Sequence, residues 1–80
     1  MVKEFNKKKL IFEGEYINGE KCGKGKEYDD YGNLIYEGEY LNEKRNDKGK
    51  EYKKGKLIFE GEYLYNLIIK EKVSFISMDY

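Results

Sequence analysis

The fold of this 80-residue chain is decided by a seven-residue segment that occurs three times, as LIFEGEY at residues 10–16, LIYEGEY at 34–40 and LIFEGEY at 57–63. The copies begin 24 and 23 residues apart and differ only by the exchange of Phe for Tyr at the third position. Self-similarity at such a period is the signature of a repeat architecture, in which each unit packs on its neighbours. The chain is therefore predicted to be a tandem array of like units.

A second, shorter block alternates with the first. The sequence GKEY occurs at residues 25–28 and 49–52, and a short polar segment with one glycine follows each copy, DDYGN at 29–33 and KKGK at 53–56. Such segments between apolar runs are typical of hairpin loops. The alternation of long block, turn and short block therefore predicts consecutive β-hairpins.

Composition favours strands over helices and a thin architecture over a thick one. The chain has no Ala, the best helix former, but it has nine Tyr, four Phe and nine Gly, which favour strands and tight turns. Hydrophobic residues make up 39% of the chain and charged residues 40%, so a two-layered core is poorly supplied. The predicted fold is all-β: an elongated, single-layer, twisted antiparallel sheet of consecutive hairpins.

Alternation along a strand assigns the long block to two faces. Leu10, Phe12, Gly14 and Tyr16 share one face, and the glycine leaves space there for an aromatic ring laid flat against the backbone. The opposite face carries paired carboxylates, such as those of residues 13 and 15. We expect the recurring rings to pack unit against unit on the first face.

The short block supplies partners for those carboxylates. Lys24 and Lys26 are predicted to face them across the strands, an arrangement that stabilises a sheet by roughly 0.2–1 kcal/mol per pair. Strict alternation places Tyr28 with these lysines, whereas a bulge at one of the glycines would move it to the aromatic side. From the sequence both alternatives stay open for Tyr28 and for the matching Tyr52.

The segment YEGEYLNEKRNDKGK at residues 36–50 resembles the MORN (membrane occupation and recognition nexus) repeat, whose pattern is Y-E-G-x-[WY]-x-N-G-x-[RK]-x-G-x-G. Residues 12–28 resemble it too. The resemblance implies one domain over residues 1–80, with a half-unit at 1–9, units at 10–33 and 34–56, and a degenerate capping unit at 57–80. Glu43 and Asp47 depart from the pattern at glycine positions, and the pattern is lost after Tyr63.

The resemblance also carries functional expectations. MORN proteins serve as scaffolds and adaptors, the family name records membrane binding, and some bacterial relatives are described as antitoxin-like, which would make the partner a toxin. For this chain the expected function is a non-catalytic protein-interaction or scaffold module that self-associates. The alternative is peripheral binding to anionic phospholipid head groups through the many lysines.

Catalytic and metal chemistry find little support in the residues. The chain has no His or Thr, so no nucleophile–base pair can be named, and the paired glutamates recur in every unit, whereas a catalytic pair is needed once. The single Cys22 lacks a second metal ligand nearby, and GKGK at residues 23–26 lacks the context of a phosphate-binding loop. We expect no enzyme activity, cofactor or metal.

Two surfaces are the candidate partner sites: the aromatic face, whose alternative role is the core between units, and the apolar C-terminal segment, whose alternative role is a cap. The partner is expected to be another protein, or a second copy through the C-terminal segment. A net charge of zero and a single Arg count against nucleic acid. No signal peptide or membrane-spanning run is visible, so a cytoplasmic location is expected. The predicted partner-binding residues are Phe12, Tyr16, Tyr36, Tyr40, Phe59, Tyr63, Leu67, Ile68, Ile69 and Phe75.

Overall fold

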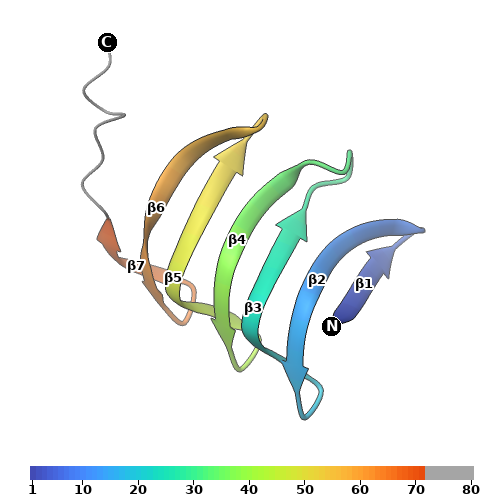
Figure 1. Cartoon of the computed structure of the whole chain (residues 1–80), viewed down its shortest axis with the longest axis horizontal. Coiled ribbons are helices and arrows are strands. Elements are labelled where there is room, and N and C mark those ends of the chain that lie inside the picture. Colours follow the sequence, from blue (N-terminus) through green and yellow to red (C-terminus); the bar gives the residue numbers. More distant parts are fainter. Residues whose placement is uncertain (72–80) are drawn as a thin grey trace.

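The computed structural model describes residues 1–71, and over that range the chain forms seven β-strands and no helix. The strands lie side by side in chain order in one open antiparallel sheet, which confirms the predicted fold (Figure 1). At about 4.8 Å between neighbouring strands, the sheet is roughly 29 Å across. The strands are β1 (Val2–Asn6), β2 (Lys9–Ile17), β3 (Glu20–Tyr28), β4 (Leu34–Leu41), β5 (Lys44–Lys53), β6 (Lys56–Leu64) and β7 (Leu67–Glu71).

Tight turns join most of the strands. Five connections are two-residue turns in which both central residues have positive φ, the geometry of a type I′ hairpin that matches the strand twist. The β3–β4 connection is longer, and the Asp29 carboxylate organises it by accepting hydrogen bonds from the backbone N–H groups of Tyr31 and Asn33, both at 2.9 Å. The five turns are centred on Lys7–Lys8, Asn18–Gly19, Asn42–Glu43, Lys54–Gly55 and Tyr65–Asn66.

A row of glycines crosses the middle of the sheet. The strand register places Gly14, Gly25, Gly38, Gly49 and Gly61 opposite one another from β2 to β6. A methyl group at Gly14 or Gly25 would lie 2.7 or 2.6 Å from the Phe12 ring, so the ring rests on bare backbone. This confirms the interpretation of the glycine as space for a ring.

The core is a line of aromatic rings on one face of the sheet, which we call the aromatic face. The rings contact one another edge to face, with centroids 5.2–5.9 Å apart. Because Tyr40 and Tyr63 each reach back to a ring of the preceding unit, the line joins units as well as strands. Each such pair stabilises by about 0.5–1.5 kcal/mol beyond its buried area. In spatial order the rings are Tyr16, Phe12, Tyr40, Tyr36, Tyr63 and Phe59.

Candidate functional site

The aromatic face also carries a ladder of alternating charges. Glu27 lies opposite Phe12 on one neighbouring strand and Tyr36 on the other, and Glu51 takes the same place one unit later. Sequence analysis placed carboxylates on the opposite face and missed these two. The signal was present, because Glu27 is two residues from Gly25 and so shares its side of β3.

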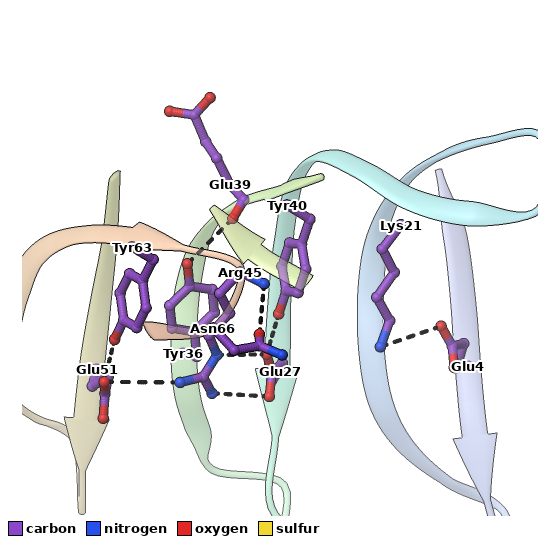
Figure 2. Close-up of polar contacts among 10 residues, drawn as sticks. All are labelled: Glu4, Lys21, Glu27, Tyr36, Glu39, Tyr40, Arg45, Glu51, Tyr63 and Asn66. Atoms are coloured by element: carbon purple, nitrogen blue, oxygen red, sulfur yellow. Dashed lines mark hydrogen bonds and ion pairs between the residues drawn. The ribbon is translucent and has the colours of Figure 1, made fainter. Parts of the chain in front are cut away.

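Arg45 is the centre of this ladder (Figure 2). Its Nε and Nη2 donate hydrogen bonds of 3.0 and 3.1 Å to the two carboxylate oxygens of Glu27, and Nη1 lies 3.8 Å from the Glu51 carboxylate. The guanidinium also stacks 4.0 Å from the centroid of the Tyr36 ring. One side chain therefore connects two carboxylates from neighbouring units across a buried ring.

These contacts shift the pKa values of both partners. Burial raises the pKa of Glu27, but the hydrogen bonds from Arg45 and Tyr40 outweigh it, so the pKa of Glu27 lies below its ordinary value. Burial lowers the pKa of Arg45, and its bonds to Glu27 more than offset this. Both groups are therefore charged at neutral pH.

The tyrosine hydroxyls complete the network. Tyr40 donates a hydrogen bond to the Glu27 carboxylate, and Tyr63 donates one to Glu51. Burial and then these bonds raise the pKa of both tyrosines, and burial raises the pKa of Tyr36 to about 12. The buried tyrosines are thus neutral hydrogen-bond donors.

The ladder changes at its C-terminal end. Lys21 occupies in the first unit the place of Arg45, opposite Tyr16, with its ammonium 4.5 Å from the Phe12 centroid and 3.8 Å from the Glu4 carboxylate. In the third unit the matching residue, opposite Tyr63, is Ile68. The alternating charges therefore end in an apolar side chain.

Four of the predicted partner-binding rings are core. Phe12, Tyr36, Tyr40 and Tyr63 are only 0–5% exposed, so these four rings take the alternative role, the core between units. Tyr16 and Phe59, at the two ends of the line, are partly buried. These rings are buried because they cover one another and because the side chains of Lys21 and Arg45 lie over them.

The opposite face, which we call the carboxylate–lysine face, has the predicted pairing. Glu13 lies opposite Lys26, Lys26 opposite Glu37, and Glu37 opposite Lys50. Glu15 departs from the expectation, because it accepts a hydrogen bond of 2.8 Å from the backbone N–H of Lys24. A groove of about 890 Å³ runs along this face over the glycine row.

The structure settles the two alternatives for Tyr28 and Tyr52. The Tyr28 hydroxyl donates a hydrogen bond to Glu13, which raises the pKa of Tyr28 to about 12, and the Tyr52 hydroxyl lies 3.5 Å from Glu37. Both tyrosines therefore lie on the carboxylate–lysine face, as strict alternation predicts.

Strand β7 is the edge of the described sheet and pairs there with β6 alone. Its residues Leu67, Ile68 and Ile69 are 68%, 53% and 58% exposed. These three predicted site residues are accessible, whereas Phe75 lies outside the described residues. The accessible part of the candidate site is therefore strand β7.

The β4–β5 and β6–β7 turns each form hydrogen bonds with the strand that precedes their hairpin, β3 and β5 respectively, a contact that sequence reasoning missed. We call this contact the clasp. Glu43 donates its backbone N–H to the Lys21 carbonyl at 3.1 Å, and its carboxylate accepts the Lys21 N–H at 2.5 Å. Asn66 does the same with the Arg45 carbonyl and N–H, both at 2.8 Å. Glu43, a departure from the repeat pattern, thus adds a contact between units.

Among residues 1–71 there is no helix able to cross a membrane. The sequence matches no family model, and comparisons with curated proteins and with solved structures found no match.

Proposed function

We propose that this chain is a non-catalytic protein-interaction module built from MORN-like repeats, and that it contacts its partner through the edge strand β7. The observation that carries the proposal is the exposure of Leu67, Ile68 and Ile69 on a strand with one paired edge in the described chain. An exposed apolar strand edge tends to pair with another chain unless it is blunted. The proposed partner is another protein or a second copy of this chain.

Strand β7 carries apolar side chains on both faces of the sheet. Ile68 shares the aromatic face with Tyr63, whereas Leu67 lies opposite the half-exposed Leu64, next along β6 and so on the other face. In the earlier units the residues at these two places are charged: Lys21 and Glu20 in the first unit, Arg45 and Lys44 in the second. The third unit thus replaces charged residues with aliphatic ones, which is typical of an interface centre depleted in charge.

The charged groups near the core support a non-catalytic role. The Glu27 carboxylate accepts hydrogen bonds from Arg45 and Tyr40, and its pKa is lowered. A general acid at neutral pH needs the opposite shift. These carboxylates join units of the array.

The experiment is affinity capture from the native lysate with matched variants. Ile69→Lys places a charge in the proposed interface, and Ile17→Lys places the same charge on a residue with the same 58% exposure far from β7. We expect a partner to be retained by the wild-type chain and by Ile17→Lys but lost from Ile69→Lys, with self-association followed by light scattering. Equal loss from both variants would contradict the proposal.

A second candidate is binding to an anionic lipid surface, which the distribution of lysines favours. Lys24, Lys26, Lys48 and Lys50 lie opposite glutamates, but other lysines gather in or beside two turns on one rim of the sheet. Between those turns lies the β3–β4 loop with the exposed Tyr31. Each basic residue near an anionic surface contributes about 1 kcal/mol. The rim lysines are Lys7, Lys8, Lys9, Lys53, Lys54 and Lys56.

Vesicle co-sedimentation at physiological salt tests this candidate. Vesicles with phosphatidylserine should retain the chain and neutral phosphatidylcholine vesicles should not, and Lys8→Glu with Lys54→Glu should release it. A matched double change on the carboxylate–lysine face, Lys24→Glu with Lys48→Glu, should matter less. Absence of pelleting with anionic vesicles removes the lipid role.

A further inference from the structure

We propose that the outer edge of β7, with which no strand of residues 1–71 pairs, repeats the backbone geometry of the junction between units, and that it binds a β-hairpin of another protein in which the pattern Tyr-x-x-Asn or Tyr-x-x-Glu leads into the turn. The inference rests on the proposed function, because it names the chemistry of the partner. Three features of the two occupied junctions, β3–β4 and β5–β6, carry it.

The first feature is the backbone clasp. Across their two-residue turns, Glu20 pairs with Ile17 and Lys44 pairs with Leu41. Lys21 and Arg45 are the next residues along the chain. Their N–H and carbonyl groups point away from their own hairpin and bind Glu43 and Asn66 of the next one.

Ile68 is the third member of this series. It directly follows Leu67, which pairs with Leu64 across the Tyr65–Asn66 turn. By the same register its N–H and carbonyl point to the outer edge of β7, where the next turn would lie. In the occupied junctions, the turn supplies a side-chain oxygen as acceptor and a backbone N–H as donor, both from a glutamate or an asparagine with positive φ.

The second feature is the ring line. The Phe12 ring contacts that of Tyr40 of the next unit at 5.2 Å and the Tyr36 ring contacts that of Tyr63 of the next at 5.6 Å, whereas the Phe59 ring has one ring neighbour among the described residues, Tyr63 of its own unit. Phe59 is correspondingly less buried. The inserted tyrosine in both occupied junctions stands three residues before the clasping residue: Tyr40 before Glu43, and Tyr63 before Asn66. This spacing is the source of the Tyr-x-x-Asn/Glu pattern.

The third feature selects a different protein over a second copy. In a folded copy, the described strands that carry this pattern, β4 and β6, are each paired on both sides, and the open edges belong to β1 and β7. β1 has no tyrosine. A folded second copy therefore has no free hairpin of the required kind, and the apolar Ile68 in place of Lys21 or Arg45 suits a partner without a facing carboxylate.

Binding of a labelled peptide to the full chain tests the inference. The probe is a synthetic peptide of residues 56–71, whose Tyr63 and Asn66 satisfy the pattern, and its affinity is measured by fluorescence anisotropy. On the chain, Ile68→Pro removes the outward N–H, while Ile68→Thr keeps it in a β-branched residue. On the probe, Asn66→Gly keeps the turn but removes the side-chain acceptor.

We expect Ile68→Pro and Asn66→Gly each to weaken binding about fivefold, the effect of one hydrogen bond. Together they should weaken it no further than either alone, because both remove the same bond. Ile68→Thr should bind within about twofold of wild type. Circular dichroism checks that each variant is folded. If the Pro variant unfolds, the Asn66→Gly probe still tests the clasp, because its binding is then compared with that of the unchanged probe on the Ile68→Thr chain.

Other outcomes overturn the inference. A dimer of the chain that Ile68→Pro abolishes, without probe binding, would make the occupant a second copy. Probe binding only to a chain ending at Glu71 would make residues 72–80 the occupant. If a captured partner depends on Ile69 but not on the Ile68 N–H, the proposed function stands and the hairpin clasp falls.

Discussion

Arg45 shows how one side chain joins two units. Its guanidinium stacks on Tyr36, is bidentate to Glu27 and lies near Glu51. A planar fork of donors matches a carboxylate in a way that a lysine ammonium does not. Lys21, at the matching place in the first unit, correspondingly makes a looser contact of 3.8 Å with Glu4.

Removing the Arg45 side chain should destabilise the fold. Arg45→Ala leaves the largely buried Glu27 carboxylate without its bidentate donor, and we expect the free energy of unfolding to fall by about 2 kcal/mol in urea denaturation. Arg45→Lys, which copies the first unit, should lose about half as much. A loss below about 0.5 kcal/mol for the alanine variant would mean that the network is dispensable.

The lowered pKa of Glu27 makes stability depend on pH. Because the folded pKa lies below the ordinary value of 4.5, the contribution of Glu27 is present above that value and is lost as pH falls through the folded pKa. In urea denaturation from pH 7 to pH 3, Glu27→Gln should be less stable than wild type at pH 7, and the gap should narrow at the acid end. A constant gap would contradict the assignment.

The buried tyrosines predict the alkaline limit. Burial raises the pKa of Tyr36 to about 12, above the ordinary value of about 10. The unfolded chain therefore loses this proton first, and stability that is present below pH 10 should decline as pH rises from there towards pH 12. Tyr36→Phe should remove part of this decline in stability, measured by urea denaturation from pH 10 to pH 12. Tyrosinate absorbance should show the corresponding ionisation missing from the variant, and an unchanged titration would contradict the role of Tyr36.

At the scale of the strands, the glycine row lets rings lie on the sheet. A methyl group at Gly38 would lie 2.6 Å from the Gly49 Cα and 2.7 Å from the Lys48 carbonyl oxygen, and would also meet the Tyr36 hydroxyl. None of these neighbours is the free end of a flexible chain except the hydroxyl, whose ring is itself buried. The strand cannot accept a side chain there without moving.

Gly38→Ala should therefore destabilise the protein by about 1–3 kcal/mol, the range for overpacked cores. Gly55 has positive φ but nothing within 4 Å, so Gly55→Asn, which tolerates that backbone region, is the matched control and should change stability by less than about 0.5 kcal/mol. Thermal denaturation of the two variants side by side checks this. Equal effects would show that space is not the reason for Gly38.

At the scale of the whole molecule, the array is held by contacts between neighbouring units. The Tyr36 ring contacts the rings of Tyr40 in its own unit and Tyr63 in the next, whereas Tyr63 is the one ring that contacts Phe59 among the described residues. In a repeat array, stability is approximately a sum of unit and nearest-neighbour terms. Loss of a central ring should therefore lower the stability of two units, whereas loss of a ring at the end should lower that of one.

Tyr36→Ala should cost about 3–5 kcal/mol and Phe59→Ala roughly half of that. Hydrogen exchange should show protection lost across β4 to β6 for the first change and mainly in β6 and β7 for the second. Equal losses, or loss confined to β4 for Tyr36→Ala, would contradict the nearest-neighbour description.

The repeat by itself determined the strands, their order and their two faces, because alternation of side chains along a strand is a local property of the backbone. The two recurring blocks therefore predicted the single sheet, the space for a ring at Gly14 and lysines facing the carboxylates of the long block. The apolar character of the C-terminal segment singled out Leu67, Ile68 and Ile69, which the structure shows to be exposed.

Only the tertiary structure decided which rings are covered, how Glu27 is shared by Arg45 and Tyr40, and how Asn66 clasps Arg45. These depend on register between strands far apart in sequence and on bulges, such as the one that sets Glu15 against the Lys24 backbone. A local pattern carries no such distance information. The open edge at Ile68 is likewise a property of the assembled array, since it exists only where the next unit is missing from the described sheet.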